Sequence, residues 1–122
     1  REVAMLEVTI PWFAAILGPN TSCHWAYKRK ARASQKQEAF WLTVESMQKN
    51  TYLFAPSKPC VLNITFYPPN KRGRDLDNCL ASIKAAIDGI ALAIQVNDKH
   101  FSYSRLEFGE VVKGGKIVII IT

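Results

Sequence analysis

The chain has 122 residues, of which 48% are hydrophobic and 21% are charged, and its formal net charge is +6. This composition is typical of a folded domain and excludes an intrinsically disordered chain. No apolar run approaches the ~20 residues of a membrane-spanning helix, and the first residues lack the pattern of a signal peptide. We therefore expect a single domain over residues 1–122 that does not contact a membrane.

The positive charge favours a nucleic acid as the partner. The sequence contains 16 basic and 10 acidic residues, and lysine and arginine side chains bind the phosphates of DNA and RNA. Many basic domains bind no nucleic acid, so charge alone leaves both alternatives open.

The cysteines indicate the compartment. Cys23, Cys60 and Cys79 are odd in number, widely spaced and without a CxxC pair. This pattern is typical of a reducing compartment, so we expect a cytoplasmic protein. Cys23 and the adjacent His24 are only two ligands, whereas structural zinc sites need about four, and we expect no zinc site.

The first half of the chain predicts a strand and a long helix. Residues 6–10 alternate apolar and polar side chains, which predicts a half-buried strand that ends at Pro11. Residues 12–22 predict a loop, residues 24–48 a helix without internal glycine or proline, and residues 50–59 a second loop. The helical spacing predicts a buried face that contains Ala26, Ala33, Phe40, Val44 and Met47.

The second half predicts a strand, a helix and a hairpin. Residues 61–67 predict a strand with Leu62, Ile64 and Phe66 on one face, and residues 76–94 predict one helix. The apolar stripe of that helix consists of Leu80, Ile83, Ile87, Ile90 and Ile94. Residues 101–112 and 116–121 predict two strands joined as a hairpin at Gly114-Gly115. The last strand is apolar throughout, which predicts a central position covered on both faces.

The order strand, helix, strand, helix, strand, strand predicts the fold class. Two main helices would pack on a mixed β-sheet, an α/β (α+β) architecture. Lys28, Arg32 and Lys36 stand four apart on the first helix. They form either a solvated surface or a basic stripe that follows phosphates.

The sharpest motif runs from Arg72 to Asn78, with the sequence Arg-Gly-Arg-Asp-Leu-Asp-Asn. On a regular helix Asp75 and Asp77 would point about 200° apart. The two carboxylates point the same way only if the backbone there is extended. We therefore expect Asp75 to precede the helix as its N-cap and Asp77 to lie in the first turn. Acidic residues at a helix start are commonly caps that suit the positive end of the helix dipole, which is the alternative to catalysis.

Three observations favour catalysis over capping. Basic residues lie next to the pair in the sequence. The preceding strand places the pair at a sheet edge, where ligands bind in layered folds. Asp98 follows the second predicted helix and is expected to fold back near Asp75 and Asp77. Three carboxylates repel one another unless a cation lies between them, and Mg²⁺ prefers oxygen ligands. Near a phosphodiester, Mg²⁺ polarises the phosphate and generates hydroxide.

Six stretches, in order, point to a known family. They are Ile10-Pro11-Trp12, Pro19-Asn20 with His24-Trp25, Arg74-Asp75-Leu76-Asp77-Asn78, Lys84-Ala85-Ala86-Ile87-Asp88-Gly89, Val96-Asn97-Asp98 and Lys113-Gly114-Gly115. Together they are spread along most of the chain, from Ile10 to Gly115, and resemble the RusA-type Holliday junction resolvases of bacteria, phages and prophages. The acidic motif is the most specific of the six.

The resemblance implies a homodimeric endonuclease that depends on Mg²⁺ or Mn²⁺ and uses no organic cofactor. It would resolve four-way DNA junctions by paired symmetric nicks during recombination and repair. Asp75, Asp77 and Asp98 match the metal-binding carboxylates of the family. Members often carry two acidic residues at the last turn, and here the first of these is Asn97.

The essential lysine of the family departs from its usual place. It usually lies one turn after the second aspartate, where this chain has Ala81. The phage-type pattern implies that Lys84 is its equivalent and stabilises charge on the scissile phosphate. The alternative for Lys84 is an (i, i+4) ion pair with Asp88.

Two basic groups are the expected contacts to DNA phosphates. They are Lys71, Arg72 and Arg74 before the acidic pair and Lys28, Arg32 and Lys36 on the first helix.

Two other classes of function stay open. One is a non-catalytic nucleic-acid-binding module whose acidic residues are caps, and the other is a structural or interaction protein whose charge is incidental.

The aromatic residues have two interpretations. Tyr67, Phe101 and Tyr103 either fill the core or stack on splayed bases, and strand aromatics usually fill cores. Trp12, Trp25 and Trp41 are expected in the core or at an interface rather than on DNA.

Overall fold

The computed structural model describes residues 2–3, 5–49, 53–57 and 59–122. The helices are α1 (Trp25–Lys49), α2 (Leu76–Ser82) and α3 (Lys84–Ile94), with 3₁₀ turns η1 (Ala15–Leu17) and η2 (Asp98–His100). The strands are β1 (Glu2–Val3), β2 (Leu6–Pro11), β3 (Leu53–Phe54), β4 (Cys60–Tyr67), β5 (Phe101–Phe108) and β6 (Lys116–Ile121). In the described part of the chain, no helix is both long enough and apolar enough to cross a membrane.

Four strands form a mixed sheet in the spatial order β2-β6-β4-β5. Strand β6 is antiparallel to both of its neighbours, whereas β4 and β5 are parallel with an irregularity after Leu62. Strands β1 and β3 form a separate parallel pair. The predicted mixed α/β architecture is therefore confirmed, with three helices in place of two.

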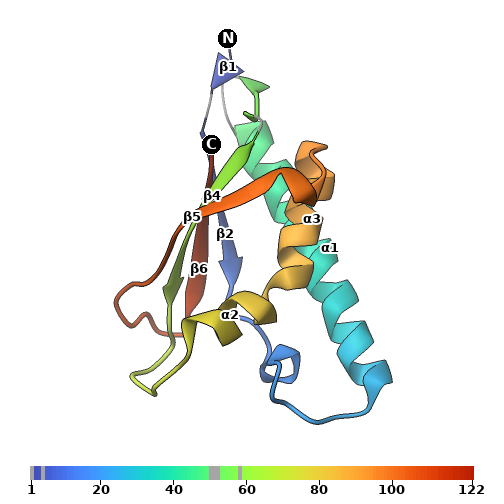
Figure 1. The fold of residues 1–122 in the computed structure, drawn as a ribbon, viewed down its shortest axis with the longest axis vertical. Coiled ribbons are helices and arrows are strands. Elements are labelled where there is room, and N and C mark those ends of the chain that lie inside the picture. The colour runs from blue at the N-terminus through green and yellow to red at the C-terminus, as the bar shows by residue number, and fades with distance from the viewer. Residues whose placement is uncertain (1, 4, 50–52, 58) are drawn as a thin grey trace.

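The helices pack against one face of the sheet (Figure 1). Alternate residues of β2, β4 and β6 are buried, as the period of a strand requires. Leu62, Ile64 and Phe66 of β4 are fully buried, as predicted. The predicted helical stripe supplies the buried Ile83, which precedes α3, and the buried Ile87, Ile90 and Ile94 of α3. Strand β6 is central, as predicted. Its other face is only half-buried, so the prediction of cover on both faces is wrong.

The predicted hairpin between the last two strands is wrong. Gly114 and Gly115 have positive φ values of 80° and 71°, and the Gly115 N–H donates to the carbonyl of Val112 at 2.8 Å, so a turn exists. The strands on either side are not neighbours, because β4 lies between β5 and β6. The apolar β6 buries more surface with two partner strands than it would at an edge beside β5.

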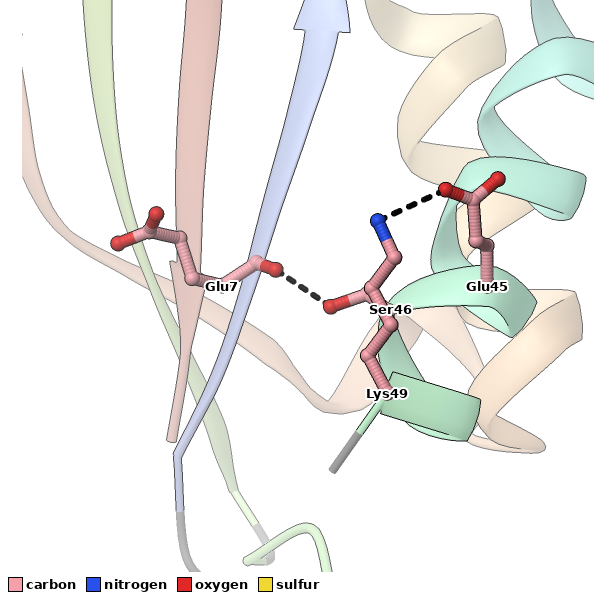
Figure 2. Close-up of polar contacts among 4 residues, drawn as sticks. All are labelled: Glu7, Glu45, Ser46 and Lys49. Carbon is pink, nitrogen blue, oxygen red and sulfur yellow. Dashed lines mark hydrogen bonds and ion pairs between the residues drawn. The ribbon is translucent and has the colours of Figure 1, made fainter. Parts of the chain in front are cut away.

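The second half of α1 is anchored to the sheet. Its buried residues, Ala39 and Thr43, both belong to this half. The Ser46 hydroxyl donates to the backbone carbonyl of Glu7 in β2 at 2.6 Å, and Lys49 forms an ion pair with Glu45 at 3.0 Å (Figure 2). The first half of α1 extends past the end of the sheet (Figure 1).

Two sequence predictions about α1 and the segment after it need correction. On the predicted apolar face of α1, Ala33 is exposed and the other four residues are only half-buried. Trp25 and Trp41 are 62% and 59% exposed, so they do not belong to the core. The predicted loop over residues 50–59 contains β3, and residues 50–52 and 58 lie outside the described residues.

The single helix predicted over residues 76–94 is divided at Ile83, which has φ −113° and ψ 16°. Gln35 of α1 spans the break. Its Nε2 donates to the carbonyl of Ser82 at 2.9 Å, and its Oε1 accepts from the backbone N–H of Ala86 at 3.1 Å. These bonds satisfy backbone groups that a continuous helix would pair internally.

Candidate functional site

Asp75 and Asp77 lie at the start of α2, on the chain that leaves β4. Asp75 has an extended backbone, with φ −98° and ψ 126°, and its Oδ1 accepts from the backbone N–H of Asp77 at 3.0 Å. Asp75 is therefore the N-cap and Asp77 lies in the first turn, as predicted. Both side chains are exposed, and the cap bond uses only one of the four carboxylate oxygens.

The loop before this pair is held by Arg74. Its Nη1 donates to the carbonyls of Asn70 and Arg72 at 3.1 and 2.9 Å, and its Nη2 donates to Asn70 Oδ1 at 2.9 Å. The guanidinium also lies over the Trp12 indole, 5.3 Å from the ring centroid. These bonds occupy three of the five N–H donors of Arg74, so this side chain mainly holds the loop in place. The side chains of Lys71 and Arg72 are exposed.

A cavity of about 410 Å³ lies beside the acidic pair. It is lined by Trp12, Arg72, Asp75 and Cys79, together with part of the loop before α1. Burial raises the pKa of the Cys79 thiol; Arg74 lowers it and Asp75 raises it, both by smaller amounts. The thiol is therefore protonated at neutral pH and is not a nucleophile here.

A basic groove runs between α1 and α3. The cavity there has a volume of about 580 Å³ and is lined by Lys28, Arg29, Arg32 and Lys36 of α1 and by Lys84 and Asp88 of α3. The structure thus gathers the three predicted basic residues of α1 with Lys84. Lys28 Nζ donates to the carbonyl of Thr21 at 3.0 Å. Within the described ranges, Lys84 and Asp88 form no ion pair.

Asp98 lies apart from the acidic pair of the same chain. It belongs to η2, which follows α3, whereas Asp75 and Asp77 precede that helix (Figure 1). Asp98 lines a different cavity with Lys36 and Asp88. Burial raises the pKa of the Tyr103 phenol, and the Asp98 and Asp88 carboxylates raise it further.

The donor chemistry of the acidic pair fits Mg²⁺. Among the residues that the structure describes, no group of three or more His, Cys, Asp or Glu side chains is arranged to hold a metal ion. Mg²⁺ commonly takes one or two carboxylates, keeps several waters and binds substrate phosphate. Asp75 and Asp77 supply two exposed carboxylates of that kind, whereas Asp98 lines a different cavity.

Several residues of the site carry no sequence signal that would have found them. Trp12 and Gln35 meet their partners Arg74 and Ser82 only through the fold, because each pair is far apart along the chain. Asn70 is different, since asparagine favours turns in which its side chain accepts from the backbone two residues on, as Asn70 Oδ1 does from the N–H of Arg72 at 3.0 Å.

The chain is similar to an uncharacterized protein of Xylella fastidiosa strain Temecula1. The two are 35% identical over an alignment of 122 positions, which covers 97% of this chain and 76% of the relative. This chain belongs to the same family as that protein. No model of a known protein family matches the chain.

Proposed function

We propose that this protein is a metal-dependent, structure-selective DNA endonuclease of the RusA type. The observation that carries the proposal is the exposed pair Asp75 and Asp77, fixed at the start of α2 by the cap bond and by the Arg74 loop. A caps-only role does not explain why the exposed Asp75 lines the same cavity as Arg72 and Arg74. The resemblance to RusA-type resolvases at the same residues supports the same function.

In this proposal Asp75 and Asp77 hold Mg²⁺ or Mn²⁺. The bound metal would polarise the scissile phosphate and activate a water. The water oxygen then bonds to phosphorus, one phosphorus–oxygen ester bond breaks, and the leaving oxygen takes up a proton. Lys84 stabilises the negative charge that develops on the phosphate. Asp98 is the third family carboxylate, although it lies apart from the pair within one chain.

The substrate is a four-way DNA junction in this proposal, and the active form is a homodimer. Phosphate contacts come from Lys71 and Arg72 in the loop and from Lys28, Arg32 and Lys36 along the groove. A junction needs two symmetric nicks, and two copies related by a two-fold axis match its symmetry. The cytoplasm of a bacterial or phage-infected cell is the proposed location.

A second candidate is a non-catalytic basic module that binds DNA. The observation in its favour is that the described residues of one chain offer no third carboxylate near Asp75 and Asp77. Incubation of a synthetic four-way junction with and without Mg²⁺ separates the two, with linear duplex of the same sequence as the control. Mg²⁺-dependent nicking of the junction supports the nuclease, and salt-sensitive binding without nicking supports the module.

A further inference from the structure

Exposed aromatic rings cluster at the free end of α1. The His24 imidazole stacks on the Trp25 indole with 5.6 Å between centroids and meets the Tyr27 ring edge-on at 6.1 Å. The Arg29 guanidinium lies 4.7 Å from the centroid of Trp25. Trp25 is 62% exposed and Tyr27 is 67% exposed. Because these rings contact one another and form a contiguous exposed patch, this set is a candidate binding surface.

The same end of α1 is strongly basic. Residues 25–37 contain five basic residues and no acidic one: Lys28, Arg29, Lys30, Arg32 and Lys36. In the part of the chain that the structure describes, none of the five forms an ion pair, and the Glu45–Lys49 pair belongs to the other end of the helix. The positive field is therefore not neutralised within the molecule and favours an anionic partner.

The rings are held in place by local bonds. The Ala26 N–H donates to His24 Nδ1 at 3.2 Å, which fixes the imidazole at the start of α1. The Lys28 ammonium donates to the carbonyl of Thr21, which ties the preceding segment to the helix. A fixed ring surface loses little conformational freedom when a planar ligand stacks on it.

We propose that Trp25, Tyr27, His24 and Arg29, together called the aromatic tip, stack on unpaired nucleotides of DNA. The inference rests on the proposed DNA-binding function and specifies the form of DNA that this surface takes. Proteins bind single strands by stacking bases on aromatic rings while basic side chains follow the backbone. The basic groove begins at the tip, since Arg29 lines it, and leads toward Lys84.

Two other occupants fit the surface less well. A symmetric second copy would bring two clusters of five positive charges together, and like charges repel. A lipid surface requires a strongly apolar helix face, whereas the turn of α1 after Tyr27 carries Lys28, Arg29, Lys30 and Arg32. An unpaired strand offers bases that stack on the rings and phosphates that bind the basic side chains.

The test compares two tryptophans of α1 that are equally exposed. Fluorescence anisotropy measures the affinity of the wild type, Trp25→Ala, Trp25→Phe and Trp41→Ala for a labelled 15-nucleotide oligo(dT) and for a blunt duplex. Trp25→Ala should weaken oligo(dT) binding by about fivefold to a hundredfold, since that is the range for one stacked base. Trp25→Phe should retain most of the affinity, and Trp41→Ala should match the wild type. Duplex binding should change little in all variants.

Several outcomes would overturn the inference. They are a wild type that does not bind oligo(dT), equal effects of Trp25→Ala and Trp41→Ala, and equal losses on oligo(dT) and duplex. Sedimentation of the same proteins tests the rival occupant, because a dimer that Trp25→Ala converts to monomer would assign the tip to a second copy. The proposed nuclease fails separately: a protein that binds oligo(dT) through Trp25 but never nicks a junction keeps this inference and loses that function.

Discussion

The guanidinium of Arg74 lies over the indole of Trp12, with 5.3 Å between the guanidinium carbon and the ring centroid. This contact joins the loop after β4 to the segment after β2. Cation–π contacts contribute about 0.5–1 kcal/mol at exposed sites, and the three hydrogen bonds of the same guanidinium add to it. Arg74 is the residue immediately before Asp75, so its fixation also fixes the start of α2.

Arg74→Ala should therefore lower turnover on a four-way junction by about 10²-fold, the effect of a small misplacement of catalytic groups. Arg74→Lys should not restore it, because an ammonium lacks the planar fork that reaches three acceptors. The control is Arg72→Ala, which removes an exposed side chain but keeps the carbonyl that Arg74 contacts. It should weaken binding and leave single-turnover cleavage at saturation unchanged. Equal behaviour of Arg72→Ala and Arg74→Ala would contradict a positioning role.

Lys84→Ala should cut single-turnover cleavage by about 10²–10³-fold, because a charge aimed at the transition state is worth about 3–4 kcal/mol. Its effect on junction affinity should be modest, since many other basic residues contact phosphates. Lys36→Ala is the matched control, because Lys36 lines the same groove from α1. It should weaken binding without slowing the saturated reaction. Normal cleavage by Lys84→Ala at saturation would leave Lys84 as a binding residue.

Gln35→Leu should destabilise the protein by about 1–3 kcal/mol, because the carbonyl of Ser82 and the N–H of Ala86 would lose their partner. The urea midpoint of unfolding measures the loss. Gln37→Leu is the control, since Gln37 is an exposed residue of the same helix. A midpoint for Gln35→Leu equal to that of Gln37→Leu would show that the break in the helix does not depend on this amide.

Gly89→Ala should also destabilise the fold, by about 1–3 kcal/mol, because overpacking forces backbone shifts. A Cβ at Gly89 would meet the backbone carbonyl of Lys36, where α3 crosses α1. Gly73→Ala should be nearly neutral, because nothing lies within 4 Å of a Cβ there. Thermal unfolding of the two variants checks the difference, and equal melting temperatures would contradict the close crossing.

The strands and the long helix were predictable because they depend on local pattern. Alternation in β2 and β4, and the run without glycine or proline in α1, produce the same element in almost any fold. The N-cap role of Asp75 was also predictable from local chemistry, since aspartate is one of the preferred residues immediately before a helix.

The features that the sequence did not predict depend on distant partners. The break at Ile83 involves Gln35, which belongs to another helix. The central position of β6 depends on its pairing with both β2 and β4, which lie far from it along the chain. The exposure of Trp25 and Trp41 follows from the narrow contact of α1, which packs through Ala39 and Thr43. Local periodicity does not report which side of a long helix meets the sheet when apolar residues occur on all sides.

The central claim is that Asp77 acts in Mg²⁺-dependent cleavage rather than in capping. Asp77→Asn tests it, because the cap oxygen belongs to Asp75 and asparagine is tolerated at a helix start, so the fold should survive. Binding and nicking of a synthetic four-way junction are measured for the wild type and Asp77→Asn, with and without Mg²⁺. We predict that the wild type nicks the junction only with Mg²⁺, and that the folded variant binds it at least as well but does not nick it. Nicking by folded Asp77→Asn at the wild-type rate, or no Mg²⁺-dependent nicking by the wild type, would contradict the account.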